Sequence, residues 1–165
     1  MSLYYIGFDI MSWQNPGLEL PARCSDLQWF MKELDGGAKD YLGAFFGACE
    51  SGCMDILKII TTISKETLNL ITLNNGLQPA SLNGHMHIVE FLLEQGANDY
   101  NVGLIYAAHR GHIDIVHLMV EKGARNFPRA IEECLSFLSN NREDHIKIDE
   151  TLFFLELYKH GKVKL

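Results

Sequence analysis

Histidine and cysteine are the residues of this sequence whose side chains could ligate a metal or take part in catalysis. The chain of 165 residues carries seven histidines and four cysteines. Three of them, Cys53, His85 and His112, directly follow a glycine and lie in similar surroundings. Imidazole and thiolate are common zinc ligands, but all ligands of one zinc ion must lie about 2.0–2.3 Å from it. Whether these three residues could share a metal therefore depends on how the segments around them are arranged.

Those segments repeat along the chain. The motif Gly-His-x-x-Ile-Val begins at Gly84 and again at Gly111, 27 residues later, and a weaker copy begins at Gly52, 32 residues before Gly84. Segments 37–41 (GAKDY) and 96–100 (GANDY) also match, and each first glycine is followed by an alanine after eleven positions and a glycine after fifteen. Agreement at this many fixed offsets indicates an internal repeat.

Each repeat unit has the pattern of two helices joined by a glycine turn. Over residues 113–120 apolar side chains recur at three- and four-residue steps, which predicts an amphipathic helix. Gly123 stands where a terminating glycine is expected, because glycine adopts positive φ without a Cβ clash. A shorter helix with a small-residue face is expected over 103–108, and Gly111 separates the two helices. One such pair cannot cover its own apolar face, so the units must stack.

Stacking argues against a shared metal and against a catalytic centre. Packed helices lie about 8–10 Å apart, so Cys53, His85 and His112 of successive units cannot reach one ion through repeat geometry alone. Cys49 with Cys53, and His109 with His112, straddle a glycine turn and do not share a helical face. The sequence also lacks nucleophile-elbow, phosphate-loop, zinc-protease and dinucleotide-binding motifs. We therefore expect no cofactor, no metal and no enzymatic activity.

The repeat resembles the ankyrin repeat, whose usual pattern is TPLHxAAxxGHxxIVxLLLxxGA. Residues 107–124 agree with this pattern very well, 80–97 well, and 48–64 more weakly. The resemblance implies an all-α solenoid of about four to five stacked helix pairs, atypical caps included. It also implies that the histidine after each glycine is structural and bridges backbone groups of neighbouring repeats.

Two departures from the family pattern bear on stability and shape. Where the family has Thr-Pro-Leu-His, residues 102–105 read Val-Gly-Leu-Ile and 75–78 read Asn-Gly-Leu-Gln, so we expect packing to replace the missing hydrogen bonds. The ankyrin period is about 33 residues, and the shortfall here lies between Ala97 and Val102, where the family forms a projecting finger. We expect stubby turns there. Such short-fingered repeats resemble those of large DNA viruses.

The ends of the chain are expected to be atypical, because one face of a terminal repeat meets water. Ser25 with Gln28 three residues later is a capping box that predicts a helix start. We expect an irregular N-terminal cap over 1–24, a single ankyrin-repeat domain over 25–161 and a tail over 162–165. Within the domain we expect a cap helix over 25–35 and repeats over about 37–64, 74–97, 98–124 and 125–161.

The charge balance excludes several classes of partner. With 14 basic and 21 acidic side chains the net charge is −7, so binding to nucleic acid or to an anionic membrane is not expected. The longest stretch without Asp, Glu, Lys or Arg, residues 67–89, holds several amides and a proline and predicts no membrane span. The start of the chain lacks a signal-peptide pattern, and the cysteines lack a disulfide framework. We expect an intracellular, cytoplasmic protein, in the host cytoplasm if the chain is viral.

The resemblance implies binding to another protein through the concave surface that first helices and turns line in ankyrin stacks. By position, the exposed residues before each glycine turn and in the short fingers form one column across the repeats. Tyrosine and arginine often anchor interfaces, so Tyr41, Tyr100 and Arg110 are expected at its centre, with Asn74 and Asn101 as hydrogen-bonding residues. The predicted partner-binding residues are Tyr41, Leu42, Glu50, Ser51, Asn74, Leu82, Asn83, Tyr100, Asn101, His109 and Arg110.

Two alternatives stay open at this point. The named residues could be ordinary solvated surface, with binding on the convex side or at an end of the stack. The second class of function is self-association, in which apolar residues of the end repeats, such as Phe153, Phe154 and the MSLYYI start, form a homodimer seam.

Overall fold

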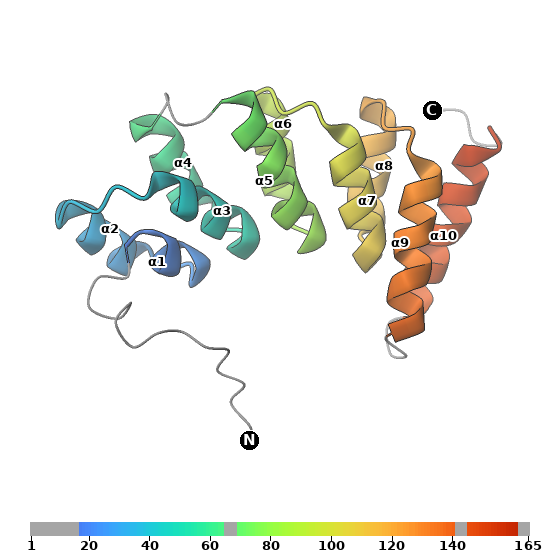
Figure 1. Ribbon diagram of the computed structural model, residues 1–165, viewed down its shortest axis with the longest axis horizontal. Coiled ribbons are helices and arrows are strands. Elements are labelled where there is room, and N and C mark those ends of the chain that lie inside the picture. Colours follow the sequence, from blue (N-terminus) through green and yellow to red (C-terminus); the bar gives the residue numbers. More distant parts are fainter. Residues whose placement is uncertain (1–16, 65–68, 141–144, 162–165) are drawn as a thin grey trace, which may run out of the picture.

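The structure is a computed structural model that describes residues 17–64, 69–140 and 145–161, and the regular secondary structure of these residues is entirely α-helical (Figure 1). The helices form five successive pairs, which confirms the predicted all-α helical-repeat architecture. The helices are α1 (Glu19–Arg23), α2 (Leu27–Asp35), α3 (Tyr41–Ser51), α4 (Met54–Ile63), α5 (Leu70–Leu82), α6 (Met86–Glu94), α7 (Tyr100–Arg110), α8 (Ile113–Lys122), α9 (Phe127–Asn140) and α10 (His145–Lys159).

The pairs stack in chain order as two layers. The first helices, α1, α3, α5, α7 and α9, each contact the next first helix along the chain, and each also contacts the second helix of its own pair. In Figure 1 the stack runs from α1 and α2 at one end to α9 and α10 at the other, with α6 and α8 behind α5 and α7. Within the described residues, no helix is both long enough and apolar enough to cross a bilayer.

Small residues let neighbouring helices approach closely at the centre of the stack. Ala107 of α7 is fully buried, as are its repeat equivalents Ala80 in α5 and Ala48 in α3. A Cβ atom on Gly103 would collide with the side chain of Met119 on α8. Larger side chains fill the space around these contacts, and each buried leucine or isoleucine contributes about 1.5–3 kcal/mol to folding.

Glycines end the helices at two recurring positions. Gly111, between α7 and α8, has φ +72°, and the following His112 N–H donates to the carbonyl of Ala107 at 2.9 Å. Gly123 after α8 has φ +119°, and the following Ala124 N–H donates to the carbonyl of Met119 at 2.9 Å. These are the closing bonds of a Schellman motif, which satisfies carbonyl groups at the helix end. The turn positions expected from the sequence are confirmed.

Two asparagines tie each first helix to the start of the next repeat. Asn74 Oδ1 accepts the backbone N–H groups of residues 98 and 99 at 2.7 and 3.1 Å. Asn101 Oδ1 accepts those of residues 125 and 126, both at 2.9 Å. The expectation that packing alone replaces the family's Thr and His was therefore incomplete, because one amide oxygen can accept two N–H groups across the repeat boundary.

The N-terminal end also differs from the expectation. Within the segment 1–24, which was expected to be irregular, residues 19–23 form α1 and pair with α2. The side chain of Asp40, just before α3, accepts the N–H groups of Leu18 at 2.7 Å and Glu19 at 3.3 Å and so caps the start of α1. This contact joins residues far apart in sequence, which is why no local pattern predicts it. Residues 1–16, with the MSLYYI start, and 162–165 lie outside the described residues.

Two helix starts are set by residues other than those expected. The N-cap of α2 is Asp26, whose carboxylate accepts the Trp29 N–H at 2.8 Å, while Ser25 has a left-handed φ of +54°. The capping box at Ser25 is therefore wrong by one residue. Helix α5 begins at Leu70, four residues before the expected repeat start at 74, with Asn69 as its N-cap.

We expect Asn101→Ala and Asn74→Ala each to lower the free energy of unfolding by about 1–2 kcal/mol, because two inter-repeat N–H groups lose their acceptor. The measurement is urea denaturation followed by far-ultraviolet circular dichroism. Asn75→Ala is the matched control: Asn75 is exposed on the same helix as Asn74, and this change carries the same gain in helix propensity. Equal midpoints for the Asn74 and Asn75 variants would contradict the structural role.

Candidate functional site

The predicted partner-binding residues lie in two rows at opposite ends of the first helices, not in one column. The helix-start row holds Tyr41, Leu42, Asn74, Tyr100 and Asn101, and the helix-end row holds Glu50, Ser51, Leu82, Asn83, His109 and Arg110. Arg110 lies ten positions after Tyr100 in α7, which corresponds to about 15 Å along the helix axis. The sequence analysis placed all of these residues in one column, but the length of the helix keeps those at its start apart from those at its end.

Most of the helix-start row is engaged inside the stack. Tyr41 and Tyr100 are half-buried and pack against the core. The amide oxygens of Asn74 and Asn101 hold the next repeat, as described above. Leu42, with 45% of its surface exposed, is the apolar member of this row that is most open to solvent.

The N-terminal part of the helix-end row is also paired within the chain. The Ser51 hydroxyl donates to the carbonyl of Ala22 at 2.7 Å, which joins α3 to α1. Glu50 forms an ion pair of 2.7 Å with Arg23. These two residues therefore hold the first two helix pairs together, although both remain partly accessible.

The C-terminal part of this row meets α9. His109 Nδ1 lies 3.3 Å from Glu133 Oε2, and its ring packs edge-on against Phe137 at 5.2 Å between centroids. The Arg110 guanidinium lies 5.3 Å from the centroid of the same Phe137 ring, a cation–π arrangement. Glu133 in turn pairs with Arg129 at 2.5 Å. Sequence reasoning missed Phe137 and Glu133, because α9 departs from the repeat pattern that identified the other positions.

The first helices expose a further strip, of which sequence reasoning named only Leu82 and His109. In α7 the residues 103, 104, 107 and 108 are buried. Residues 102, 105, 106 and 109, on the other side of the helix, are half-buried. Helical periodicity could have found this strip, since its members fall three or four positions apart. We call it the first-helix face, and it comprises Asn75, Gln78, Leu82, Val102, Ile105, Tyr106, His109, Arg129, Glu132 and Glu133.

The histidines after the glycine turns are structural, as the resemblance implied. His85 Nε2 lies 2.9 Å from the Glu50 carbonyl oxygen, and His112 Nε2 lies 3.1 Å from that of Leu82. Since a carbonyl only accepts, each Nε2 carries the proton and donates across the repeat boundary. Each ring also covers the inter-helix glycine of the preceding repeat: a Cβ atom on Gly84 would lie 2.6 Å from the His112 ring.

The described residues contain no group of three or more His, Cys, Asp or Glu side chains that could hold a metal ion. Two of the four cysteines are buried, and none of the four is in a disulfide. Burial raises the pKa of the Cys49 thiol far above its ordinary value. Burial, with a smaller contribution from Glu133, raises that of Cys134 to about 12. Both thiols therefore stay protonated at neutral pH and are poor nucleophiles.

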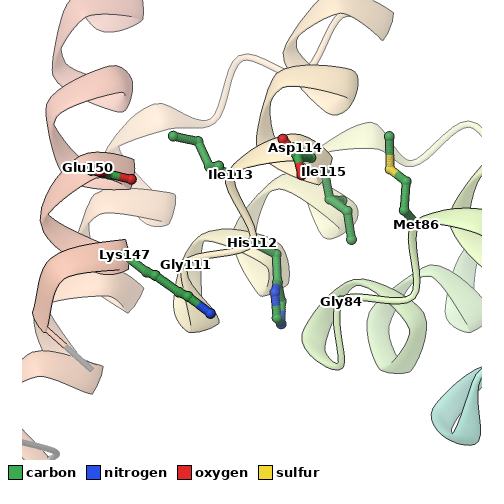
Figure 2. Close-up of a pocket in the computed structure, with 9 residues that line it drawn as sticks. All are labelled: Gly84, Met86, Gly111, His112, Ile113, Asp114, Ile115, Lys147 and Glu150. Carbon is green, nitrogen blue, oxygen red and sulfur yellow. The ribbon is translucent and has the colours of Figure 1, made fainter. Parts of the chain in front are cut away.

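Two adjoining pockets lie where the α7–α8 turn meets α10. One, of about 290 Å³, is drawn in Figure 2, where His112 stands between Gly111 and Gly84 and the Lys147 side chain extends from α10. The other, of about 260 Å³, shares His112 and Lys147 with it and is lined by Leu82, Asn83, Arg110, His112, Phe137 and Lys147. We call this second one the cationic pocket.

The positive charges around the cationic pocket contribute to lowering the pKa of His112. Burial lowers this pKa most, and the positive charges of Lys147, Arg110 and His85 lower it further, against the hydrogen bond to the Leu82 carbonyl, which raises it. The ring is therefore neutral at pH 7. Because the unfolded chain binds this proton more readily, the contribution of His112 to stability falls as pH drops below about 6.5.

An NMR titration of the His112 ring should give a pKa below about 6.5. Lys147→Gln and Arg110→Gln should each raise this pKa, because each removes a positive charge that opposes protonation. Lys122→Gln, at the far end of α8, removes the same charge and should leave it unchanged. A His112 pKa that is insensitive to both Lys147 and Arg110 would show that these charges do not act on the pocket.

The geometry agrees with the comparison to known families. Residues 45–129, slightly more than half of the chain, match a family model described as ankyrin repeats in three copies. The match runs from within α3 to the start of α9 and includes the three inter-helix glycine turns described above. No curated protein matches the chain. On this match and on its five stacked helix pairs, the chain belongs to the ankyrin repeat family.

Proposed function

We propose that this protein binds another protein through the first-helix face, with the contact centred on α7 and α9. Ankyrin repeats are generally protein–protein interaction modules, and members of the family are typically non-catalytic. The general role thus comes from the family, and the location on this chain comes from its exposed side chains.

The observation that carries the location is the composition of the face around α7. Val102, Ile105 and Tyr106 are half-buried, and Val102 and Ile105 also pack against the core with part of their surface. Polar and charged side chains flank them, with His109 on α7 itself and Glu132 on α9. An apolar and aromatic centre with a charged rim is the usual composition of a binding interface.

The two predicted anchors at the ends of α7 differ in their suitability. Arg110 is exposed and held in place by Phe137, so it is available to a partner. Tyr100 packs against the core, and its ring approaches Gly123 in the turn after α8. A substitution at Tyr100 would therefore change packing as well as binding, and Tyr106 is the better aromatic position for a test.

We also propose an intracellular location, in the cytoplasm, or in the host cytoplasm if the short-fingered repeats reflect a viral origin. The state of the cysteines supports this location, since an exposed thiol at Cys24 and three further unpaired thiols suit a reducing compartment.

Self-association through the C-terminal repeat is a second candidate. Phe153 on α10 has 62% of its surface exposed, and its ring packs edge-on against Phe154. An apolar ring exposed to this degree at the end of a stack could contact a second copy.

Sedimentation equilibrium over a hundredfold range of concentration tests self-association. If the protein binds only foreign partners, the mass should stay at 18.7 kDa. If Phe153 forms a dimer seam, the mass should rise with concentration, and Phe153→Ser should abolish the rise. A rise that persists in this variant would rule out Phe153 as the seam.

Affinity capture from the native cell, followed by mass spectrometry and a binding measurement on the purified partner, tests the main proposal. Tyr106→Ala with His109→Ala should weaken that partner at least about tenfold, equivalent to 1.4 kcal/mol. Lys58→Ala with Lys122→Ala, on second helices, should leave the affinity unchanged. Thermal unfolding of each variant checks the fold. The opposite pattern would place the interface on the other side of the stack.

A further inference from the structure

We propose that the cationic pocket binds a carboxylate of an acidic segment of the partner protein, through Arg110 and Lys147. This inference rests on the proposed function and adds to it the chemistry of the partner. The pocket lies at the edge of the first-helix face and shares Leu82 with it, so one partner can occupy both.

The first argument is uncompensated charge. Arg110 and Lys147 both line this pocket, and among the described residues neither forms an ion pair, as is also the case for several other lysines and arginines of the chain. Among the residues that the structure describes, no aspartate or glutamate lines the cationic pocket. The pocket therefore places two positive charges side by side in a chain whose net charge is −7. Partly enclosed charges of one sign attract an opposite charge more strongly than the same groups on open surface.

The second argument is preorganisation. The Arg110 guanidinium lies over the ring of Phe137, which is itself only 9% exposed, so the charge is held by a fixed wall. The base of Lys147 packs on the α7–α8 turn: its Cβ lies 3.2 Å from where a Cβ on Gly111 would be. A planar guanidinium donates two parallel hydrogen bonds to a carboxylate. Such a site loses little conformational entropy when the ligand arrives.

Both cations act on the same point of the pocket. The positive charges of Arg110 and Lys147 each oppose protonation of His112, which also lines the pocket. The His112 ring is neutral and its Nε2–H is used by the Leu82 carbonyl. The ring therefore forms part of the wall, and the ligand charge is left to Arg110 and Lys147.

The adjoining pocket sets the direction of approach. That pocket is lined by Asp114 and Glu150 beyond Lys147 (Figure 2). A carboxylate that approached through that pocket would be repelled by Asp114 and Glu150. One that approached over Leu82 and Asn83 would pass only uncharged or positively charged residues among the described lining of the cationic pocket. An acidic segment is therefore expected to enter from the first-helix face.

A peptide of four glutamates, acetylated and amidated at its ends, tests the inference on the full-length, ¹⁵N-labelled protein. Two-dimensional NMR should show saturable shifts at the amides that surround the cationic pocket, and a tetraglutamine peptide should give none. Arg110→Gln with Lys147→Gln should weaken binding at least about tenfold, since both charge-assisted hydrogen bonds to the carboxylate are lost. Lys58→Gln with Lys122→Gln makes the same change in net charge and should bind like the wild type.

Three results would each overturn the inference. They are equal binding of tetraglutamate by the Arg110/Lys147 variant and the wild type, shifts confined to other surfaces, and binding of a phosphoserine peptide but not of tetraglutamate. If the double variant unfolds, Lys147→Gln alone, at an exposed position, should still show a weakening of severalfold, and no weakening would count against the site. With a captured partner, loss of affinity on Tyr106→Ala but not on the Arg110/Lys147 change would keep the proposed function and reject this inference. Loss in neither would reject both.

Discussion

The structure depends on the close contact of neighbouring helix pairs at small buried residues. Ala48, Ala80 and Ala107 occupy the same position in three successive first helices and are fully buried. One pair has no partner of its own that could cover this side, so the stack exists only as a whole. The same contact holds the first helices parallel and side by side, which leaves one face of each of them to solvent.

The glycine turns allow hydrogen bonds to form between neighbouring repeats. The left-handed glycines after α3 and α5, Gly52 and Gly84, leave room for the histidine of the next repeat, whose Nε2–H reaches a carbonyl at the end of the preceding first helix. At Gly111 this arrangement ends, because Lys147 and Ile148 of α10 occupy the place that a histidine ring takes at Gly52 and Gly84. The C-terminal repeat thus departs from the pattern at the point where it brings a cation close to Arg110.

Polar residues at and near the starts of the first helices form hydrogen bonds within the stack and are therefore less available to a partner. Asn74 and Asn101 hold the next repeat across a boundary where the family usually employs other side chains. Asp40 does similar work in the opposite direction when it caps α1. This division leaves the middle and the ends of α7 and α9, rather than the short turns, as the surface with unassigned aromatic and charged groups.

The sequence by itself determined most of the helices and their terminating glycines, because each depends on residues within about four positions or on a fixed repeat offset. The bridging role of the histidines followed from the resemblance to the ankyrin repeat. The sequence did not determine α1, whose start is capped by Asp40 from the next repeat. Nor did it place Phe137 beneath Arg110 or Lys147 beside His112. These contacts join α7 to the atypical helices α9 and α10, where no repeat offset applies. Only the packing of the tertiary structure decides which side chains meet there.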